Sequence, residues 1–118
     1  MDFLNHLNGF FKLSEWQDKL IDFYTSNPDS IKPKSRYNEV LSFIHGGLRD
    51  LSISRTTFKW GIPVPNNNKH VMYVWIDALC HYLTSIGYPE QQSENLTNFW
   101  PGIHIVGKDI LRFHSVYW

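Results

Sequence analysis

Cysteine is nearly absent from this sequence of 118 residues, which contains only Cys80. A single cysteine excludes a disulfide within the chain and is typical of proteins from reducing compartments. No apolar run approaches the roughly 18 residues that a membrane-spanning helix needs, and the first residues lack the regions of a signal peptide. An excess of charge is missing too, because 11 basic residues balance 11 acidic ones. The composition therefore predicts neither a membrane protein nor a basic surface for nucleic acid.

The common signatures of metal and hydrolase chemistry are also missing. The 6 histidines show no spacing of the His-x-His or His-Glu-x-x-His type, and Cys80 has no partner cysteine, so no metal site is predicted. No Gly-x-Ser-x-Gly elbow and no P-loop occur. Aromatic residues are abundant instead, at 16% of the chain with 5 tryptophans, and side chains of this kind fill cores and ligand pockets.

The first part of the chain predicts a helical hairpin. Residues 14–26 have the apolar spacing of a helix, with Ser14 as N-cap and Gln17 completing a capping box. Residues 35–45 repeat the helical spacing, and Gly46 and Gly47 supply a stop. We therefore expect two antiparallel helices before residue 50.

The remainder predicts strands that alternate with helices. A short strand at 51–54, an extended stretch at 61–65 and a turn at 66–68 precede two apolar strands, 71–76 and 103–106. Helices are expected over 78–86, 93–100 and 109–118. Two nearly continuous apolar strands, each followed by a helix, favour an α/β fold with a parallel sheet. Asp77 and Asp109 would lie at its carboxyl edge, where such sheets bind ligands.

Two groups of residues are candidates for a binding site. Gly107 lets a ligand approach the backbone, and the Asp109 carboxylate can accept hydrogen bonds from vicinal ribose hydroxyls. The alternative is that Gly107 only makes a turn and Asp109 only caps a helix. The second group is Trp75, at the end of a predicted strand, with Ala78, Leu79 and Tyr82 on the helix that follows; a small residue beside large aromatic ones can leave a slot for a slender apolar side chain, or the group can simply be core. A stripe at helical spacing in the last predicted helix contains Phe113, His114 and Trp118, and a stripe of this kind is usually core.

Several blocks of the sequence, taken together, resemble the methionyl-tRNA synthetase family in order and spacing. They are Ser54-Arg55, Trp60-Gly-Ile-Pro-Val-Pro65, Tyr73-Val-Trp-Ile-Asp-Ala-Leu79, Gly107-Lys-Asp-Ile-Leu-Arg-Phe-His114 and Tyr117-Trp118. Phe10-Phe-Lys-Leu-Ser14 and Asn38-Glu-Val-Leu-Ser-Phe43 resemble the segment by which that family returns from its connective peptide. The resemblance covers nearly the whole chain and is closest to the branch of bacteria and organelles.

The resemblance implies a fold and a domain organisation. Residues 1–50 would be the helical segment that returns from the connective peptide, and 51–118 the C-terminal half of a Rossmann catalytic domain. The implied fold class is α/β, with a partial Rossmann-type parallel sheet and flanking helices after a helical hairpin. Because a helical pattern still runs at Trp118, the sequence is expected to be an internal piece of a longer protein.

The resemblance also implies an activity and roles for the candidate residues. The family activates L-methionine with ATP, with Mg²⁺ expected to accompany the nucleotide, and then esterifies tRNA(Met). Gly107 and Asp109 would meet the adenosine ribose, and Tyr82 and His114 would sit near the thioether sulfur. The methionine pocket would be lined by Trp75, Ala78, Leu79, Tyr82, Phe113, His114 and Trp118. Some members of the family have proline at the position of Leu79.

The resemblance leaves part of the machinery outside this sequence. The family's HIGH and KMSKS signatures are absent here, so no catalytic residue is assigned and the isolated chain is expected to be inactive, with little contact to nucleic acid. The alternatives are a non-catalytic module that binds methionine or a protein, and an unrelated small nucleotide-binding domain. A bacterial cytoplasm is the expected location, or else an organelle matrix.

Overall fold

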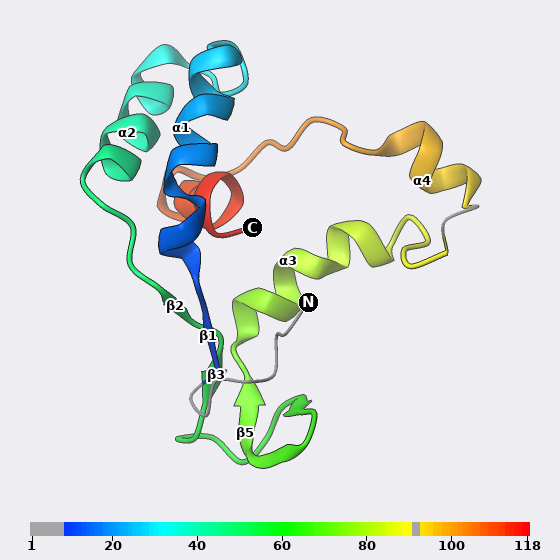
Figure 1. Cartoon of the computed structure of the whole chain (residues 1–118). Helices are drawn as coiled ribbons and strands as arrows, with labels where there is room; N and C mark the ends of the chain where they lie inside the picture. The colour runs from blue at the N-terminus through cyan, green and yellow to red at the C-terminus, as the bar shows by residue number, and fades with distance from the viewer. Residues whose placement is uncertain (1–8, 91–92) are drawn as a thin grey trace.

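The computed structural model of this chain describes residues 9–90 and 93–118 and combines helices with short strands (Figure 1). A strand and a single 3-10 turn precede the first helix, and a similar turn precedes the last one. In chain order the elements are β1 (Phe10–Phe11), η1 (Leu13–Trp16), α1 (Gln17–Ser26), α2 (Lys34–His45), β2 (Leu51–Ser52), β3 (Ser54–Arg55), β4 (Pro63–Val64), β5 (Asn67–Met72), α3 (Val74–Thr84), α4 (Glu94–Phe99), η2 (Lys108–Ile110) and η3 (Phe113–Tyr117).

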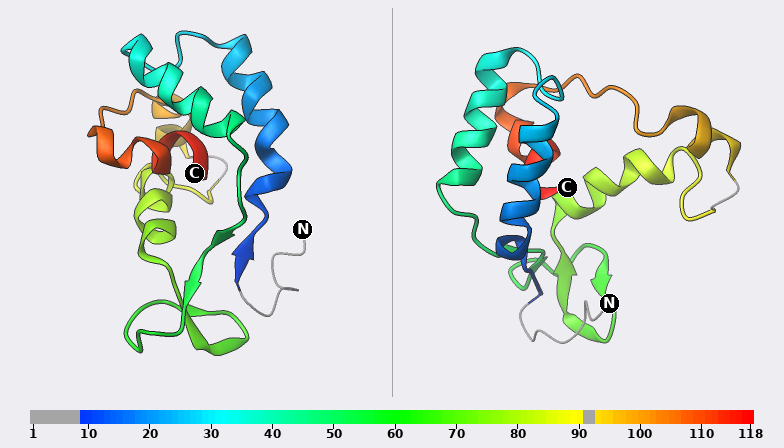
Figure 2. Two further views of the ribbon diagram at one scale, coloured as in Figure 1. Left: turned by 90° about the vertical axis from the view of Figure 1, so that its left-hand side faces the viewer. Right: turned by 45° about the horizontal axis from the view of Figure 1, so that its top comes forward.

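The predicted helical hairpin is confirmed as α1 and α2, which lie side by side with the C-terminal segment against them (Figure 2). Val40 and Ile44 are fully buried one helical turn apart on α2. Burying an aliphatic side chain of this kind stabilises a fold by about 1.5–3 kcal/mol. One buried cluster therefore joins the beginning of the chain to its end, and its members are Leu13, Tyr24, Tyr37, Val40, Ile44, Leu48, Leu111 and Val116.

The predicted capping box at the start of α1 is wrong. The Ser14 hydroxyl donates to the Asp50 carboxylate at 2.5 Å, and the Ser14 amide donates to the same oxygen at 3.2 Å. The Gln17 side-chain oxygen accepts the amide hydrogen of Leu48 at 2.7 Å. Both side chains therefore bond residues of the segment that follows α2, Leu48 and Asp50, and neither caps its own helix.

The predicted parallel sheet is wrong, because every strand pair among the described residues is antiparallel. β1 pairs with β2, and a separate sheet has the strand order β3-β5-β4. The segment at 103–106, expected to be a strand, is extended without a partner strand among the described residues, and Ile103 and Ile105 are 93% and 96% exposed. The fold is mixed α/β with two small antiparallel sheets.

The strand predicted over 71–76 is part of this error, because a short apolar run of this composition occurs both in buried strands and in buried helices. Periodicity cannot separate the two in so short a run. The structure divides it, since β5 ends at Met72 and α3 begins at Val74, with Tyr73 between them in extended conformation. Asp77 therefore lies inside the first turn of α3 and is not its cap. β5 also carries the polar residues 67–70 back from a tight turn, and such a turn brings its strands together antiparallel.

The final third of the chain leads from α3 back to the helical hairpin (Figure 1). α4 begins at a capping serine, because the Ser93 hydroxyl accepts the Leu96 amide hydrogen at 3.4 Å. The extended segment then crosses toward α1, where η2 and η3 replace the regular helix expected over 109–118. In the part of the chain that the structure describes, no helix has the length and apolar character needed to cross a bilayer.

Candidate functional site

Helix α3 brings four of the predicted pocket residues onto one face. Trp75, expected at the end of a strand, lies in the first turn of the helix instead. Trp75, Ala78, Leu79 and Tyr82 therefore stand at positions i, i+3, i+4 and i+7 of a single helix. Leu79 is 3% exposed and fixes the helix in place, whereas Trp75, Ala78 and Tyr82 are half-buried.

The C-terminal segment supplies the rings that face α3. The Phe113 ring stacks on the Trp75 indole, with centroids 4.1 Å apart and planes inclined by 18°. The His114 ring approaches the same indole at 6.3 Å, edge to face. Both residues belong to η3, a stretch of π-helix in which the Trp118 amide donates to the Phe113 carbonyl at 3.1 Å. Short π-helical stretches are rare and occur often at functional sites.

Tyr82 and His114 form a hydrogen-bonded pair between α3 and η3. Their hydroxyl oxygen and Nε2 atoms are 2.9 Å apart, and His114 Nδ1 lies 2.9 Å from the Ile110 carbonyl oxygen. A carbonyl only accepts, so Nδ1 carries a hydrogen. In the neutral imidazole, Nε2 is then the acceptor, and the Tyr82 hydroxyl donates its single hydrogen to it. The backbone of the C-terminal segment therefore determines the tautomer of His114 and the direction of this hydrogen bond.

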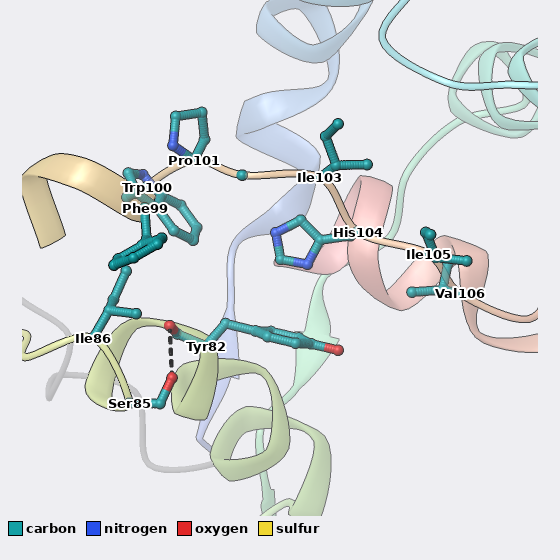
Figure 3. A pocket seen from close by; sticks show the side chains of 11 residues that line it. Tyr82, Ser85, Ile86, Phe99, Trp100, Pro101, Ile103, His104, Ile105 and Val106 are labelled. Atoms are coloured by element: carbon teal, nitrogen blue, oxygen red, sulfur yellow. Dashed lines mark hydrogen bonds between the residues drawn. The ribbon is translucent and has the colours of Figure 1, made fainter. Parts of the chain in front are cut away.

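A cavity of about 310 Å³ opens beside this pair, within the range of small-molecule sites. Tyr82 lines it from α3, and the segment from Phe99 to Val106 lines the opposite wall (Figure 3). The Trp118 ring lies 5.4 Å from the Tyr82 ring, but it lines the neighbouring cavity and not this one. A larger, more enclosed cavity of about 980 Å³ adjoins the first and is lined by His114, Ser115 and Trp118 together with Tyr24.

Two further rings, those of Trp100 and His104, belong to the cluster around Tyr82 and Trp118 but were not predicted from the sequence. The His104 ring meets the Tyr82 ring edge-on at 4.8 Å and lies 5.6 Å from Trp118, and Figure 3 shows it turned toward Tyr82. The Trp100 ring meets Trp118 edge-on at 5.3 Å. Side chains of an extended segment alternate between two faces, so a lone polar residue between Ile103 and Ile105 was the available signal for His104.

Gly107 and Asp109 lie on the η2 side of the site and do not join the ring cluster. A Cβ added at Gly107 would meet nothing within 4 Å, so the space beside this backbone is open to a ligand. Asp109 is exposed at the first turn of η2. Among the described residues, no side chain forms an ion pair or hydrogen bond with its carboxylate, which leaves both oxygens available to hydroxyl donors.

Tyr24 is the titratable group whose environment changes its ionisation most clearly. Burial raises the pKa of the Tyr24 phenol from 10.0 to about 12, and the Ser115 side chain opposes this only in part. The phenol therefore remains a hydrogen-bond donor throughout the neutral pH range. Within residues 9–90 and 93–118, no group of three or more His, Cys, Asp or Glu side chains is placed to hold a metal ion.

Comparison with known proteins identifies the family. Residues 3–118 match the family described as tRNA synthetases class I (M). The chain is 66% identical over 110 residues to a methionine–tRNA ligase of Rickettsia felis and 61% identical over 109 residues to one of Mesorhizobium japonicum, covering 92% of this chain in each case. It spans about 21% of the length of each of these relatives.

Solved structures agree with the sequence matches. Methionyl-tRNA synthetase of Mycobacterium tuberculosis in complex with methionyl-adenylate superimposes with a TM-score of 0.88 at 57% identity, and its free form with a TM-score of 0.86. These comparisons cover 92% of this chain and 22% of the mycobacterial one. The chain therefore belongs to the class I (M) family of tRNA synthetases, the methionyl-tRNA synthetases.

Proposed function

We propose that this chain is part of a methionine–tRNA ligase, which activates L-methionine with ATP to methionyl-adenylate and transfers the methionyl group to tRNA(Met). The observation that carries the proposal is the ring cluster between α3 and η3, beside a cavity of about 310 Å³. It occurs in a chain 57% identical to a mycobacterial methionyl-tRNA synthetase whose structure contains methionyl-adenylate. In this proposal the chain supplies the methionine pocket and one side of the adenosine site.

The proposed pocket suits a thioether side chain. Methionine is unbranched and polarizable, and its sulfur interacts favourably with aromatic rings at about 5 Å. The stacked rings of Trp75 and Phe113 are proposed to form one wall, and Trp118, which lines the larger cavity, the side next to Tyr82. Ala78 leaves room between Trp75 and Tyr82 on the same face of α3, and Leu79, buried beneath that face, is assigned to the base of the pocket. The walls are therefore apolar and rigid, as binding of a slender side chain requires.

Tyr82 and His114 are proposed to recognise the sulfur. A thioether is only a weak acceptor, and the hydroxyl hydrogen of Tyr82 is already donated to His114 in the neutral pair. The pair is therefore proposed to favour methionine by presenting polar atoms at a fixed position in an otherwise apolar pocket. Two substrates that differ by about one methylene group differ in binding free energy by about 1–3 kcal/mol in such a pocket.

Gly107 and Asp109 are proposed to hold the adenosine ribose of ATP. The open space beside Gly107 admits a sugar edge to the backbone, and the Asp109 carboxylate, which no side chain of the described residues bonds, can accept hydrogen bonds from two vicinal hydroxyls. Activation then consists of positioning the methionine carboxylate against the α-phosphate and stabilising the charge that develops there. Mg²⁺ would accompany the nucleotide, but the described residues contain no cluster of ligands for it, and none of them is assigned to the metal.

Methionine-dependent exchange of ATP with pyrophosphate tests this proposal, using the full-length protein that contains this segment. We expect exchange with L-methionine and at least tenfold weaker exchange with L-leucine. Trp75→Ala should raise the KM for methionine at least tenfold because it removes the wall stacked on Phe113. Trp60→Ala is the matched control, since Trp60 is 93% exposed and lies outside the cluster.

Two outcomes would reject the proposal. Exchange that does not depend on methionine would reject the activity, and binding of methionine without exchange would favour a non-catalytic module. Equal effects of Trp75→Ala and Trp60→Ala would retain the activity but reject the assignment of the pocket to α3 and η3.

A further inference from the structure

Tyr24 connects the helical hairpin to the segment that carries His114. It lies near the end of α1 and is only 6% exposed. Its hydroxyl donates to the backbone carbonyl of Ser115, at 2.5 Å, across a sequence separation of 91 residues. The phenol is therefore a buried, directed contact between α1 and η3, two parts of the chain that are distant in sequence.

The carbonyl that accepts this hydrogen bond follows directly after a proposed methionine contact. Ser115 is the middle residue of η3, and its own hydroxyl donates to the Leu111 carbonyl at 2.8 Å. His114, its neighbour, bonds Tyr82 at one ring nitrogen and the Ile110 carbonyl at the other. A rotation of η3 about its axis would therefore move the Ser115 carbonyl away from Tyr24 and His114 away from Tyr82 at the same time.

We propose that Tyr24 is a positioning residue for the methionine site, which it serves by holding η3 in the rotation that directs His114 and Trp118 toward Tyr82. The inference rests on the proposed function and extends it to a residue outside the pocket. Tyr24 acts through the backbone of Ser115 and bonds neither His114 nor Tyr82. Its hydrogen bond is the directional part of the contact and adds to the apolar packing of Leu111 and Val116 in the same core, which is not directional in itself.

The environment of Tyr24 suits this role. Its pKa is raised to about 12 by burial, so the hydroxyl keeps its hydrogen throughout the neutral pH range. Tyr37 donates to the Tyr24 carbonyl at 2.8 Å and packs edge-on against the Tyr24 ring with centroids 6.3 Å apart. Tyr37 is also 6% exposed. The two phenols are therefore equally buried in the same core, but only that of Tyr24 reaches η3.

This pair of phenols provides a matched experiment in the full-length protein. Tyr24→Phe and Tyr37→Phe each remove one oxygen and keep the ring, so both should fold and lower the melting temperature by similar amounts. We expect Tyr24→Phe alone to raise the KM for methionine in pyrophosphate exchange about three- to tenfold, with the KM for ATP changed less than twofold. The dissociation constant of methionine, measured by quenching of tryptophan fluorescence, should rise by the same factor.

The outcomes separate this inference from the proposed function. A wild-type protein without methionine-dependent exchange overturns both. An active wild type whose KM for methionine is unchanged in Tyr24→Phe overturns the positioning role alone. Equal increases in KM in Tyr24→Phe and Tyr37→Phe also overturn it, because they would show that the two residues act only through the stability of the core.

Discussion

Removal of the Tyr82 hydroxyl is the most direct perturbation of the proposed methionine site. The hydroxyl lies 2.9 Å from His114 Nε2 and joins α3 to η3. Tyr82→Phe keeps the ring, and with it the contacts to His104 and Trp118 at 4.8 and 5.4 Å. The variant therefore removes one hydrogen bond and leaves the aromatic wall in place.

The expected size of the effect follows from the half-buried position of both partners. A hydrogen bond between neutral groups contributes about 0.5–1.5 kcal/mol, and an acceptor left without a donor in a buried site costs about 1–3 kcal/mol. Because this site is partly open to solvent, water replaces some of the loss. We expect Tyr82→Phe to lower kcat/KM for methionine by about 1–2 kcal/mol, which corresponds to roughly five- to thirtyfold.

A double-mutant cycle with His114→Phe measures the pair itself. The four proteins of the cycle are compared by kcat/KM in methionine-dependent pyrophosphate exchange, in the full-length protein. If the two groups act through their mutual hydrogen bond, the second substitution costs little once the first is made, and the coupling energy is about 0.5–1.5 kcal/mol. His81→Phe is the control, because His81 lies 4.4 Å from the Tyr82 ring but is exposed and bonds the Ala78 carbonyl.

Additive losses in this cycle would refute the reasoning, since they would show that Tyr82 and His114 contribute independently. An effect of His81→Phe as large as that of Tyr82→Phe would also refute it. In that case general disturbance of α3 would explain the loss, and the hydrogen bond would not.

Three further predictions follow from other parts of the structure. Asp109→Asn should raise the KM for ATP about tenfold and leave the KM for methionine within twofold, because the neutral amide accepts the ribose hydroxyls less strongly than the carboxylate does; equal changes in both KM values would contradict the assignment. Gln17→Ala should lower the free energy of unfolding by about 1–3 kcal/mol, measured by denaturant titration, because it removes the acceptor of the buried Leu48 amide; an unchanged unfolding midpoint would contradict this. The pKa of Tyr24 rises from 10.0 in the unfolded chain to about 12 in the folded one, so the stabilisation by its neutral phenol is complete below pH 10 and is lost as the pH rises toward 12. Over this range the free energy of unfolding of the wild type should fall by up to about 2 kcal/mol more than that of Tyr24→Phe. Parallel plots of unfolding free energy against pH for the two proteins would contradict the prediction.

Helical spacing predicted a shared face for Ala78, Leu79 and Tyr82, whereas Trp75 was expected at the end of a strand. Trp75, Ala78, Leu79 and Tyr82 are three, one and three positions apart, which places them on one face whenever the segment is helical. Phe113, His114 and Trp118 are one and four positions apart, which indicated a shared helix face in the C-terminal segment, where the structure has the π-helical η3. Trp100 and His104 were missed because they lie outside any regular element, where spacing says nothing about which rings meet.

The sequence by itself determined the helical hairpin, the part of α3 that follows Asp77 and the family, because apolar spacing and ordered motifs are local properties of the chain. Only the tertiary structure decided which elements meet. In the structure the strands pair antiparallel, and the Gln17 side chain accepts the Leu48 amide hydrogen instead of forming a capping box. The Tyr24 hydroxyl bonds a carbonyl 91 residues away. Periodicity records which face of an element is apolar, but not which element covers that face. Pairings across long separations therefore leave no signal in a single sequence.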